Sequence, residues 1–173
     1  MRVNQSGGRF GPWMIALFWA TVLVMLTLYF SGLLDTRRNP NRNLSLVTSA
    51  GGSAEVVLRR NRSGHYLANG AINQQTVEFL VDTGATLVSM SASSADRLGL
   101  QRGAPTTSLT AGGVVHSWLV TLDSVQIGPI QRRDVRAVVV PGMPGDVVLL
   151  GMSFLDGLEM VQRDDTLIIR PPG

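Results

Sequence analysis

A run of uncharged residues near the amino terminus divides the chain into one part suited to lipid and one suited to water. The run, FGPWMIALFWATVLVMLTLYFSGLL, covers Phe10–Leu34 and contains no Asp, Glu, Lys or Arg. About 20 apolar residues in a helix cross the hydrocarbon core of a bilayer. Trp13 and Tyr29 lie near its two ends, where aromatic rings prefer the membrane interface. The sequence therefore predicts a transmembrane helix over residues 13–34, after a short tail of residues 1–12.

A cleaved signal peptide is the alternative interpretation of this run. The apolar region of a signal peptide is about 7 to 15 residues long and ends at a small-x-small cleavage site. The run here is longer and continues into LLDTRRNPNR, which favours an uncleaved anchor. Arginines flank both ends in nearly equal number, so charge alone assigns no orientation in the membrane.

The residues after the run separate into a polar segment and a domain rich in β-branched residues. Residues 35–53, DTRRNPNRNLSLVTSAGGS, show no hydrophobic period and predict a flexible linker. From residue 54 to 173, short apolar runs alternate with turn residues, which is typical of an all-β domain. The expected strands are Glu55–Arg60, His65–Ile72, Thr76–Val81, Thr106–Thr110, Val114–Leu122, Arg133–Val140, Val147–Leu150, Glu159–Gln162 and Thr166–Ile169.

Short connections between these strands predict antiparallel pairing in a small closed barrel or sandwich. One helix is expected in SASSADRLGL, which begins at Ser91, because serines cap helix starts and Gly99 follows its end. A second short helix is expected to begin at Ser153.

Charge and composition exclude several classes of function. Beyond Arg2 and Arg9, 13 arginines face 12 acidic residues, so no basic face is expected and a nucleic-acid partner is not predicted. The absence of cysteine excludes disulfides, thiolate zinc sites and a thiol nucleophile. His65 and His116 are far apart in the sequence and show no metal-ligand spacing. We therefore expect neither a metal nor another cofactor.

The segment VEFLVDTGATLVSM ends an apolar strand on a carboxylate, that of Asp82. A carboxylate at or beneath a surface loop needs hydrogen-bond donors around it. Thr83 offers a hydroxyl, Gly84 lets the backbone approach closely, and Ala85 keeps the space small. A plain turn explains the D-T-G triplet alone. The strand before it and the later apolar run VVLLGMSFL favour a functional site.

Three segments in this order, FLVDTGAT, the glycine-bearing hairpin LTAGGVVHSWLV and VVLLGMSFL, resemble the retropepsin-like aspartic proteases, the single-lobe relatives of pepsin. The resemblance covers about residues 55–170, and the apolar run before it is similar to the membrane-anchored bacterial branch of that group. It implies an all-β fold: a closed antiparallel retropepsin-like barrel with one short helix, preceded by one transmembrane helix.

The resemblance also implies roles for particular residues. The expected catalytic residues are Asp82, Thr83 and Gly84. The expected substrate-binding residues are Ala85 and, in a mobile flap, Ala111, Gly112 and Gly113. The expected support beneath the active loop is Leu149, Leu150 and Gly151. In this family, the glycine after the Asp-Thr pair donates its backbone N–H to the catalytic carboxylate.

Peptide hydrolysis by this chemistry requires two carboxylates that share one proton, because like charges about 3 Å apart cannot both ionise. One chain supplies a single D-T-G, so we expect a homodimer in which each chain contributes Asp82. The expected function is a membrane-anchored aspartic endopeptidase acting on polypeptides. The family resemblance favours a single-pass protein of the bacterial inner membrane with its catalytic domain in the periplasm.

Two other functions fit parts of the sequence. A catalytically silent retropepsin-like module that binds peptides would carry the same Asp82. VDTGATLVS also looks like the first phosphate loop of actin-like and sugar-kinase ATPases. That fold needs well over twice this length of soluble chain and a second phosphate loop, so the length of the chain argues against it.

Overall fold

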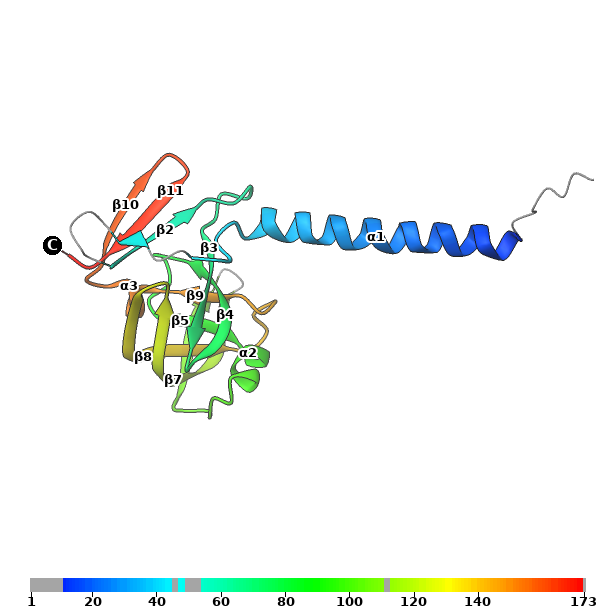
Figure 1. Cartoon of the computed structure of the whole chain (residues 1–173). Helices are drawn as coiled ribbons and strands as arrows, with labels where there is room; N and C mark the ends of the chain where they lie inside the picture. Colours follow the sequence, from blue (N-terminus) through cyan, green and yellow to red (C-terminus); the bar gives the residue numbers. More distant parts are fainter. Residues whose placement is uncertain (1–10, 45–46, 49–53, 111–112, 173) are drawn as a thin grey trace, which may run out of the picture. The chain divides into compact units, whose positions relative to one another are not determined.

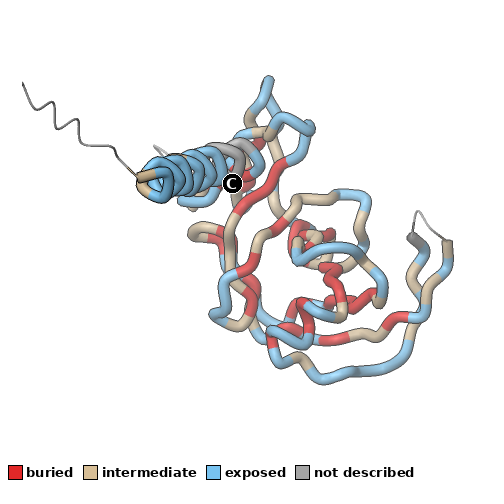
Figure 2. Tube along the Cα trace, turned by 90° about the vertical axis from the view of Figure 1, so that its right-hand side faces the viewer, coloured by how far each residue is buried: buried red, intermediate tan, exposed pale blue. Residues whose placement is uncertain are grey.

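The computed structural model describes residues 11–44, 47–48, 54–110 and 113–172, and the chain divides into two units between Arg37 and Arg38 (Figure 1). The first unit contains helix α1 (Pro12–Arg38), which is 27 residues long, except for its last residue. Its segment Pro12–Ser31 has a mean hydropathy of 2.0 and is long and apolar enough to cross a membrane, properties that a signal sequence shares. Large apolar residues are exposed along this helix, and Figure 2 colours most of its trace as exposed.

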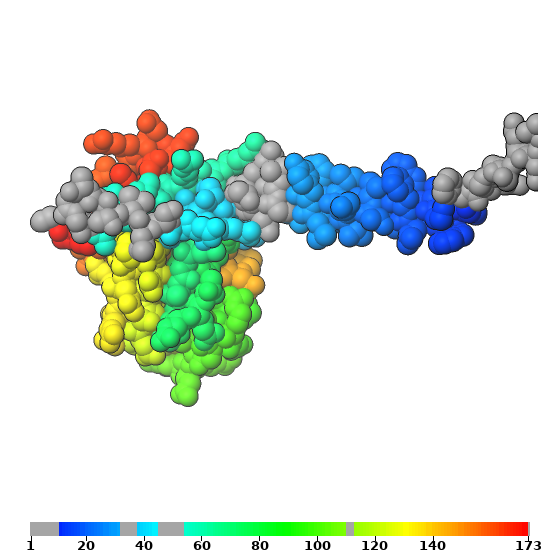
Figure 3. Space-filling view, viewed as in Figure 1, coloured from blue at the N-terminus to red at the C-terminus, as the bar shows by residue number. Residues whose placement is uncertain are grey.

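Six strands of the second unit close into a barrel. They are β3 (Leu67–Ile72), β4 (Gln75–Val81), β5 (Val88–Ser91), β7 (Gly113–Ile127), β8 (Ile130–Val140) and β9 (Val148–Leu150). Their order is β3-β4-β9-β5-β8-β7, and β7 pairs with β3 through Ala71↔Gln126 and Ile72↔Val125 to close the ring. Figure 3 shows the chain around residues 120–135, in yellow, against the green residues of β3 and β4. The prediction of an all-β closed barrel is confirmed.

Two pairings differ from the predicted antiparallel arrangement. Strand β4 pairs with β9 in parallel, and β5 pairs with β8 in parallel. The prediction assumed hairpins between neighbours. Parallel neighbours need crossover connections, and here the chain passes through a helix and two further strands between β5 and β8. Strand β6 (Pro105–Thr110) pairs with the first half of β7 and extends the sheet outward from the barrel.

The two short helices lie where the sequence predicts them. Helix α2 (Ala92–Arg97) begins after Ser91, whose side-chain oxygen accepts a hydrogen bond from the Ser94 N–H. This contact satisfies one of the free N–H groups of the first turn. Gly99 follows the helix with φ of +68°, a conformation that glycine adopts without strain. Helix α3 (Met152–Leu155) follows β9 directly.

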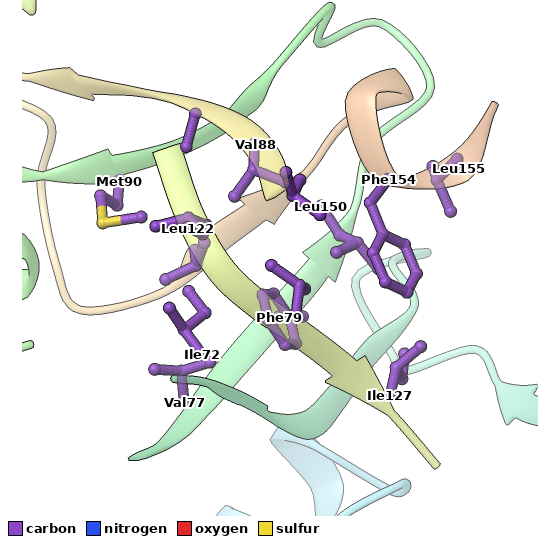
Figure 4. Packing of buried hydrophobic residues seen from close by; sticks show 14 of the residues in the cluster. Ile72, Val77, Phe79, Val88, Met90, Leu122, Ile127, Leu150, Phe154 and Leu155 are labelled. Atoms are coloured by element: carbon purple, nitrogen blue, oxygen red, sulfur yellow. The ribbon is translucent and has the colours of Figure 1, made fainter. Parts of the chain in front are cut away.

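The core lies inside the barrel, where several elements contribute fully buried apolar side chains (Figure 4). Phe79 of β4, Leu122 of β7, Leu150 of β9 and Phe154 of α3 all have 0% of their surface exposed. Strand β8 contributes Val135, Ala137 and Val139 to this core. Burial of such side chains stabilises the fold by about 1.5 to 3 kcal/mol for each large residue.

A second, four-stranded sheet joins the two ends of this unit. It contains β1 (Val47–Thr48), β2 (Ala54–Arg59), β10 (Glu159–Arg163) and β11 (Thr166–Arg170), in the order β1-β2-β11-β10. Val56 and Leu58 of β2 and Leu167 and Ile169 of β11 are buried and belong to the same core as the barrel.

The predicted flexible linker, residues 35–53, has more structure than the sequence indicates. Helix α1 continues to Arg38, and two asparagines after it, Asn39 and Asn41, are only 1% and 5% exposed. The amide of Asn41 donates to the carbonyl oxygens of Arg59 and Leu67 at 2.9 and 2.6 Å, and its oxygen accepts from the Arg59 N–H at 2.7 Å. Residues 38–44 are therefore part of the folded unit. Residues 45–46 and 49–53 of the predicted linker lie outside the described residues.

Candidate active site

The end of β4 places Asp82 at the start of a tight loop. The Val81 N–H donates to the carbonyl of Tyr66 at 3.0 Å, and the Asp82 N–H donates to the carbonyl of Leu150 at 3.2 Å. The backbone is thus held between β3 and β9 up to the aspartate itself. Ala85 then closes the turn, with its N–H on the Asp82 carbonyl at 3.3 Å. Two neighbouring strands therefore fix the direction in which the Asp82 side chain leaves the sheet.

The carboxylate of Asp82 is half-buried and accepts a hydrogen bond from the Gly84 N–H, at 2.9 Å from Oδ1. This is the contact that the family resemblance implies for Gly84. A Cβ at position 84 would lie 3.2 Å from the same oxygen, which is closer than most side-chain carbons approach. Thr83 is exposed beside it.

The segment after β9 supports the Asp82 loop from below. Gly151 is buried, and a Cβ there would collide with the Leu87 carbonyl and lie 2.7 Å from the Ala85 oxygen. The next two N–H groups donate to the same loop: Met152 to the Ala85 carbonyl at 2.8 Å and Ser153 to the Thr86 carbonyl at 3.0 Å. Glycine is required here because two stretches of backbone touch.

The two leucines before Gly151 belong to the same support. Leu149 pairs with Leu80 of β4 and Ser89 of β5, and Leu150 pairs with Val81. The structure thus brings Leu149, Leu150 and Gly151 beside the Asp82 loop.

Ser153 has a structural role that the sequence analysis missed. Its hydroxyl accepts a hydrogen bond from the Val88 N–H at 2.9 Å and donates one to the Arg136 carbonyl at 2.7 Å. One side chain of α3 therefore links the start of β5, just after the Asp82 loop, to β8. No local sequence signal indicates such a bridge, because its partners lie 65 and 17 residues away.

A cleft of about 1030 Å³ opens over the Asp82 loop. Its floor includes Asp82, Gly84 and Ala85, and one wall is formed by the outer face of β8 and the following segment, residues 141–144. Residues 106–109 of β6 and Val115 of β7 line the opposite side. Of the predicted substrate-binding residues, Ala85 lines this cleft. Arg136, Val138, Val140 and residues 141–144 were not predicted as part of a site.

The predicted flap corresponds to the hairpin of β6 and β7. Ala111 and Gly112, the expected tip residues, lie outside the described part of the chain. Gly113 begins β7 with φ of +108° and pairs with Thr110. Leu109 and Val114, which face each other across the hairpin, are 86% and 71% exposed. This end of the hairpin therefore presents apolar side chains to solvent, and Leu109 also lines the cleft.

The cleft is lined by one acidic and one basic side chain. Asp82 lies in its floor and Arg136 on its β8 wall. The other residues that line it are apolar or uncharged. A carboxylate among such neighbours, reached through an open groove, suits acid–base chemistry on an extended chain better than tight binding of a charged ligand.

Comparisons with known proteins agree on one family. Residues 68–157 match the family model of the gag-polyprotein aspartyl protease. An uncharacterised protein from the cobV 5′ region of Sinorhizobium sp is 34% identical over 97% of this chain and 78% of its own length. An uncharacterised protein of Rickettsia prowazekii (strain Madrid E) is 31% identical over 66% of this chain and 50% of its own.

A solved structure extends this likeness to three dimensions. The crystal structure of a retropepsin-like aspartic protease from Rickettsia conorii aligns with a TM-score of 0.58 and 33% sequence identity. The alignment covers 68% of this chain and 90% of that one.

Proposed function

The chain belongs to the retropepsin-like aspartic protease family, and from this premise we propose that it is a membrane-anchored aspartic endopeptidase, active as a homodimer. The observation that carries the proposal is the position of Asp82. Its carboxylate lies in the floor of a cleft beneath a hairpin and is held by the Gly84 N–H. The cleft has room for an extended polypeptide.

In the proposed reaction, the Asp82 carboxylates of two chains share one proton. The ionised carboxylate takes a proton from a water molecule, whose oxygen attacks the carbonyl carbon of the peptide bond. The protonated carboxylate donates a hydrogen bond to the carbonyl oxygen. When the C–N bond breaks, the leaving nitrogen takes a proton from the pair. The hydrogen bond from Gly84 supports this mechanism because it orients the carboxylate.

The proposed anchor is the apolar part of α1. A span over residues 13–34 would confine all copies to one plane, which raises their effective concentration and favours pairing. We further propose a domain of residues 54–173 in the periplasm and a short amino terminus in the cytoplasm of a bacterial cell. Protease treatment of spheroplasts tests the orientation: digestion of the domain is expected, and its protection would reverse the proposed topology.

The catalytic proposal is tested with Asp82→Asn in the full-length chain, purified in non-ionic detergent. Wild type and variant are incubated with a proteome-derived peptide library, and new termini are identified by mass spectrometry. We expect Asp82→Asn to lose at least about a thousandfold in cleavage rate, as the loss of a central catalytic group does. Asp123→Asn, which changes an exposed aspartate of β7, is the matched control and is expected to cleave as wild type.

Two results would contradict the proposal. Cleavage that persists in Asp82→Asn would exclude Asp82 as the catalytic acid. Peptide binding without cleavage by the wild type would indicate the silent binding module instead.

A further inference from the structure

A second hollow, of about 520 Å³, adjoins the Asp82 cleft beside the hairpin of β6 and β7. It is lined by residues 100–104, by residues 119–121 of β7 and by Arg136 of β8. Leu119 and Arg136 line both the hollow and the cleft, so the two spaces meet at these side chains. A chain lying in the cleft over Asp82 therefore reaches the hollow when it continues past Arg136.

The segment that forms one side of the hollow is fixed against β7. The Leu119 N–H donates to the Ala104 carbonyl at 2.8 Å. A Cβ on Gly103 would collide with the Leu119 carbonyl, so glycine allows the two backbones to touch. Arg102 lies with its guanidinium carbon 4.5 Å from the centroid of the Trp118 ring. Such stacking restricts the arginine side chain while its N–H groups stay free to bind.

The second arginine is anchored through its backbone. The carbonyl of Arg136 accepts the hydrogen bond from Ser153, and the residue pairs with Thr121 across β7 and β8. Its side chain is exposed on the outer face of the strand. Both arginines thus stand on hydrogen-bonded backbone, and both line the same hollow.

The charge of the hollow is uncompensated. Arg102 and Arg136 line it, and no acidic residue does. Within the described residues, neither guanidinium has a carboxylate within ion-pair distance, whereas Arg38, Arg97 and Arg170 each have one at 3.3 Å or less. Two unpaired guanidinium groups on a preformed surface are a binding site for an anion such as a carboxylate.

We propose that Arg102 and Arg136 form a basic subsite that binds an acidic side chain of the substrate, a few residues away from the bond that is cut. That the substrate is a polypeptide follows from the proposed function, on which this proposal rests. The subsite makes the protein selective for segments that carry Asp or Glu on one side of the cleavage point. Since both arginines are exposed, we expect a preference of about two- to tenfold over the neutral amide, weakening as salt is added.

Binding is measured apart from cleavage, on full-length protein in non-ionic detergent at low salt. Short labelled peptides are made as pairs that differ only in Glu or Gln at one position, and each is titrated by fluorescence anisotropy on the Asp82→Asn chain. We expect the Glu member of at least one pair to bind two- to tenfold more tightly. Arg102→Gln and Arg136→Gln should each reduce this ratio, and together they should bring it to about one. Arg133→Gln, on the same strand but outside both hollows, is the matched control and should keep it.

Three outcomes overturn the subsite: equal binding of all Glu and Gln members, a ratio that survives the double variant, and no binding of any acidic peptide. Cleavage of the same pairs by wild type separates this proposal from the proposed function. If peptides with Glu and with Gln are cleaved at equal rates, the proposal of an endopeptidase stands and the proposal of a basic subsite is wrong. If the Glu peptides bind more tightly but no peptide is cleaved, the proposal of a basic subsite stands and the proposal of an endopeptidase is wrong.

Discussion

The loop that carries Asp82 is held in place by residues that come much later in the chain. Gly151 lets the backbone after β9 lie directly beneath the loop, and Ser153 bonds to both Val88 and the Arg136 carbonyl. The position of the Asp82 carboxylate therefore depends on the hydroxyl of Ser153 and on the absence of a side chain at Gly151.

Ser153→Ala tests this dependence. The substitution removes two hydrogen bonds and leaves the Val88 N–H without its acceptor, so we expect the free energy of unfolding to fall by about 1 to 3 kcal/mol. Denaturant unfolding of the full-length chain in detergent measures it. Ser63→Ala, at an exposed turn residue, should change the value by less than about 0.5 kcal/mol. A loss equal to that of Ser63→Ala would show that the bridge does not stabilise the loop.

What the sequence predicts at single residues depends on how far apart the partners are. The contact of Gly84 with Asp82 is local, and the D-T-G motif with its family resemblance indicates it. Arg102 and Arg136 look like ordinary surface arginines, since nothing near either of them in sequence indicates a shared hollow. Only the pairing of β7 with β8 and the seating of Ala104 on Leu119 bring them together.

At the scale of elements, the segment after α1 is fastened to the barrel by buried asparagine amides. Asn39 donates to Asn69 Oδ1 at 3.1 Å and to Glu78 Oε1 at 2.9 Å, and Arg38 lies 3.3 Å from Glu78 Oε2. With the three side-chain hydrogen bonds of Asn41, these contacts hold residues 38–41 against the folded unit, in the first part of the segment whose composition predicts a flexible linker.

Asn41→Ala is expected to lower the free energy of unfolding by about 2 to 4 kcal/mol, because it leaves buried backbone groups of Arg59 and Leu67 without partners. Thermal and denaturant unfolding of the full-length chain measure the change. Asn43→Ala alters an exposed asparagine two positions later and should have almost no effect. Equal stability of the two variants would show that the segment is not fastened in solution.

The ion pair between β10 and β11 predicts a pH dependence. Glu159 accepts a hydrogen bond from Arg170 Nε at 2.8 Å, and this bond, helped by the charge of Arg170, lowers the pKa of Glu159. The unfolded chain thus binds this proton at higher pH than the folded chain. The contribution of the pair is present above the ordinary glutamate pKa and is lost as pH falls through the lowered one.

Glu159→Gln should therefore flatten the fall of the melting temperature between about pH 5 and pH 3, measured by circular dichroism. The effect is expected to be small, because both groups are solvent-exposed. Asp123→Asn should leave the slope unchanged. A slope in Glu159→Gln as steep as in wild type would contradict the role of the pair.

Every strand that the sequence predicts overlaps a strand of the structure, whereas β1 and β5 were missed. Strand β5 has four residues, two of them serines, and all four are buried. Its strand character comes from β8 and β9 on either side rather than from its own pattern. Strand β7 continues to Ile127 beyond the predicted end because its polar residues face solvent on alternate positions.

At the scale of the whole molecule, the proposed reaction needs a second copy of the chain. The cleft described here is lined by one aspartate, Asp82, whereas the proposed mechanism uses two carboxylates. Activity should then depend on the pairing of chains in the membrane, and not only on the fold of each.

Co-expression of wild type with Asp82→Asn tests this dependence. With equal amounts and random pairing, half of the wild-type chains have an inactive partner, so activity per wild-type chain should fall to about one half. A larger excess of the variant should lower it further. Peptide cleavage by the purified mixtures gives the measurement, and co-expression with Asp123→Asn is the control. If the activity per wild-type chain stays the same when the variant is present, the monomer is active.

The two faces of strand β8 have different roles: one packs in the core and the other lines the cleft. Val135, Ala137 and Val139 face the core, while Arg136, Val138 and Val140 line the cleft. If the proposed activity holds, mutations on the outward side can change which peptides the cleft accepts, while the inward side still packs in the core of the barrel. Related proteins can thus differ in substrate preference while they keep the same fold. We expect their sequence differences to concentrate at every second residue of this strand.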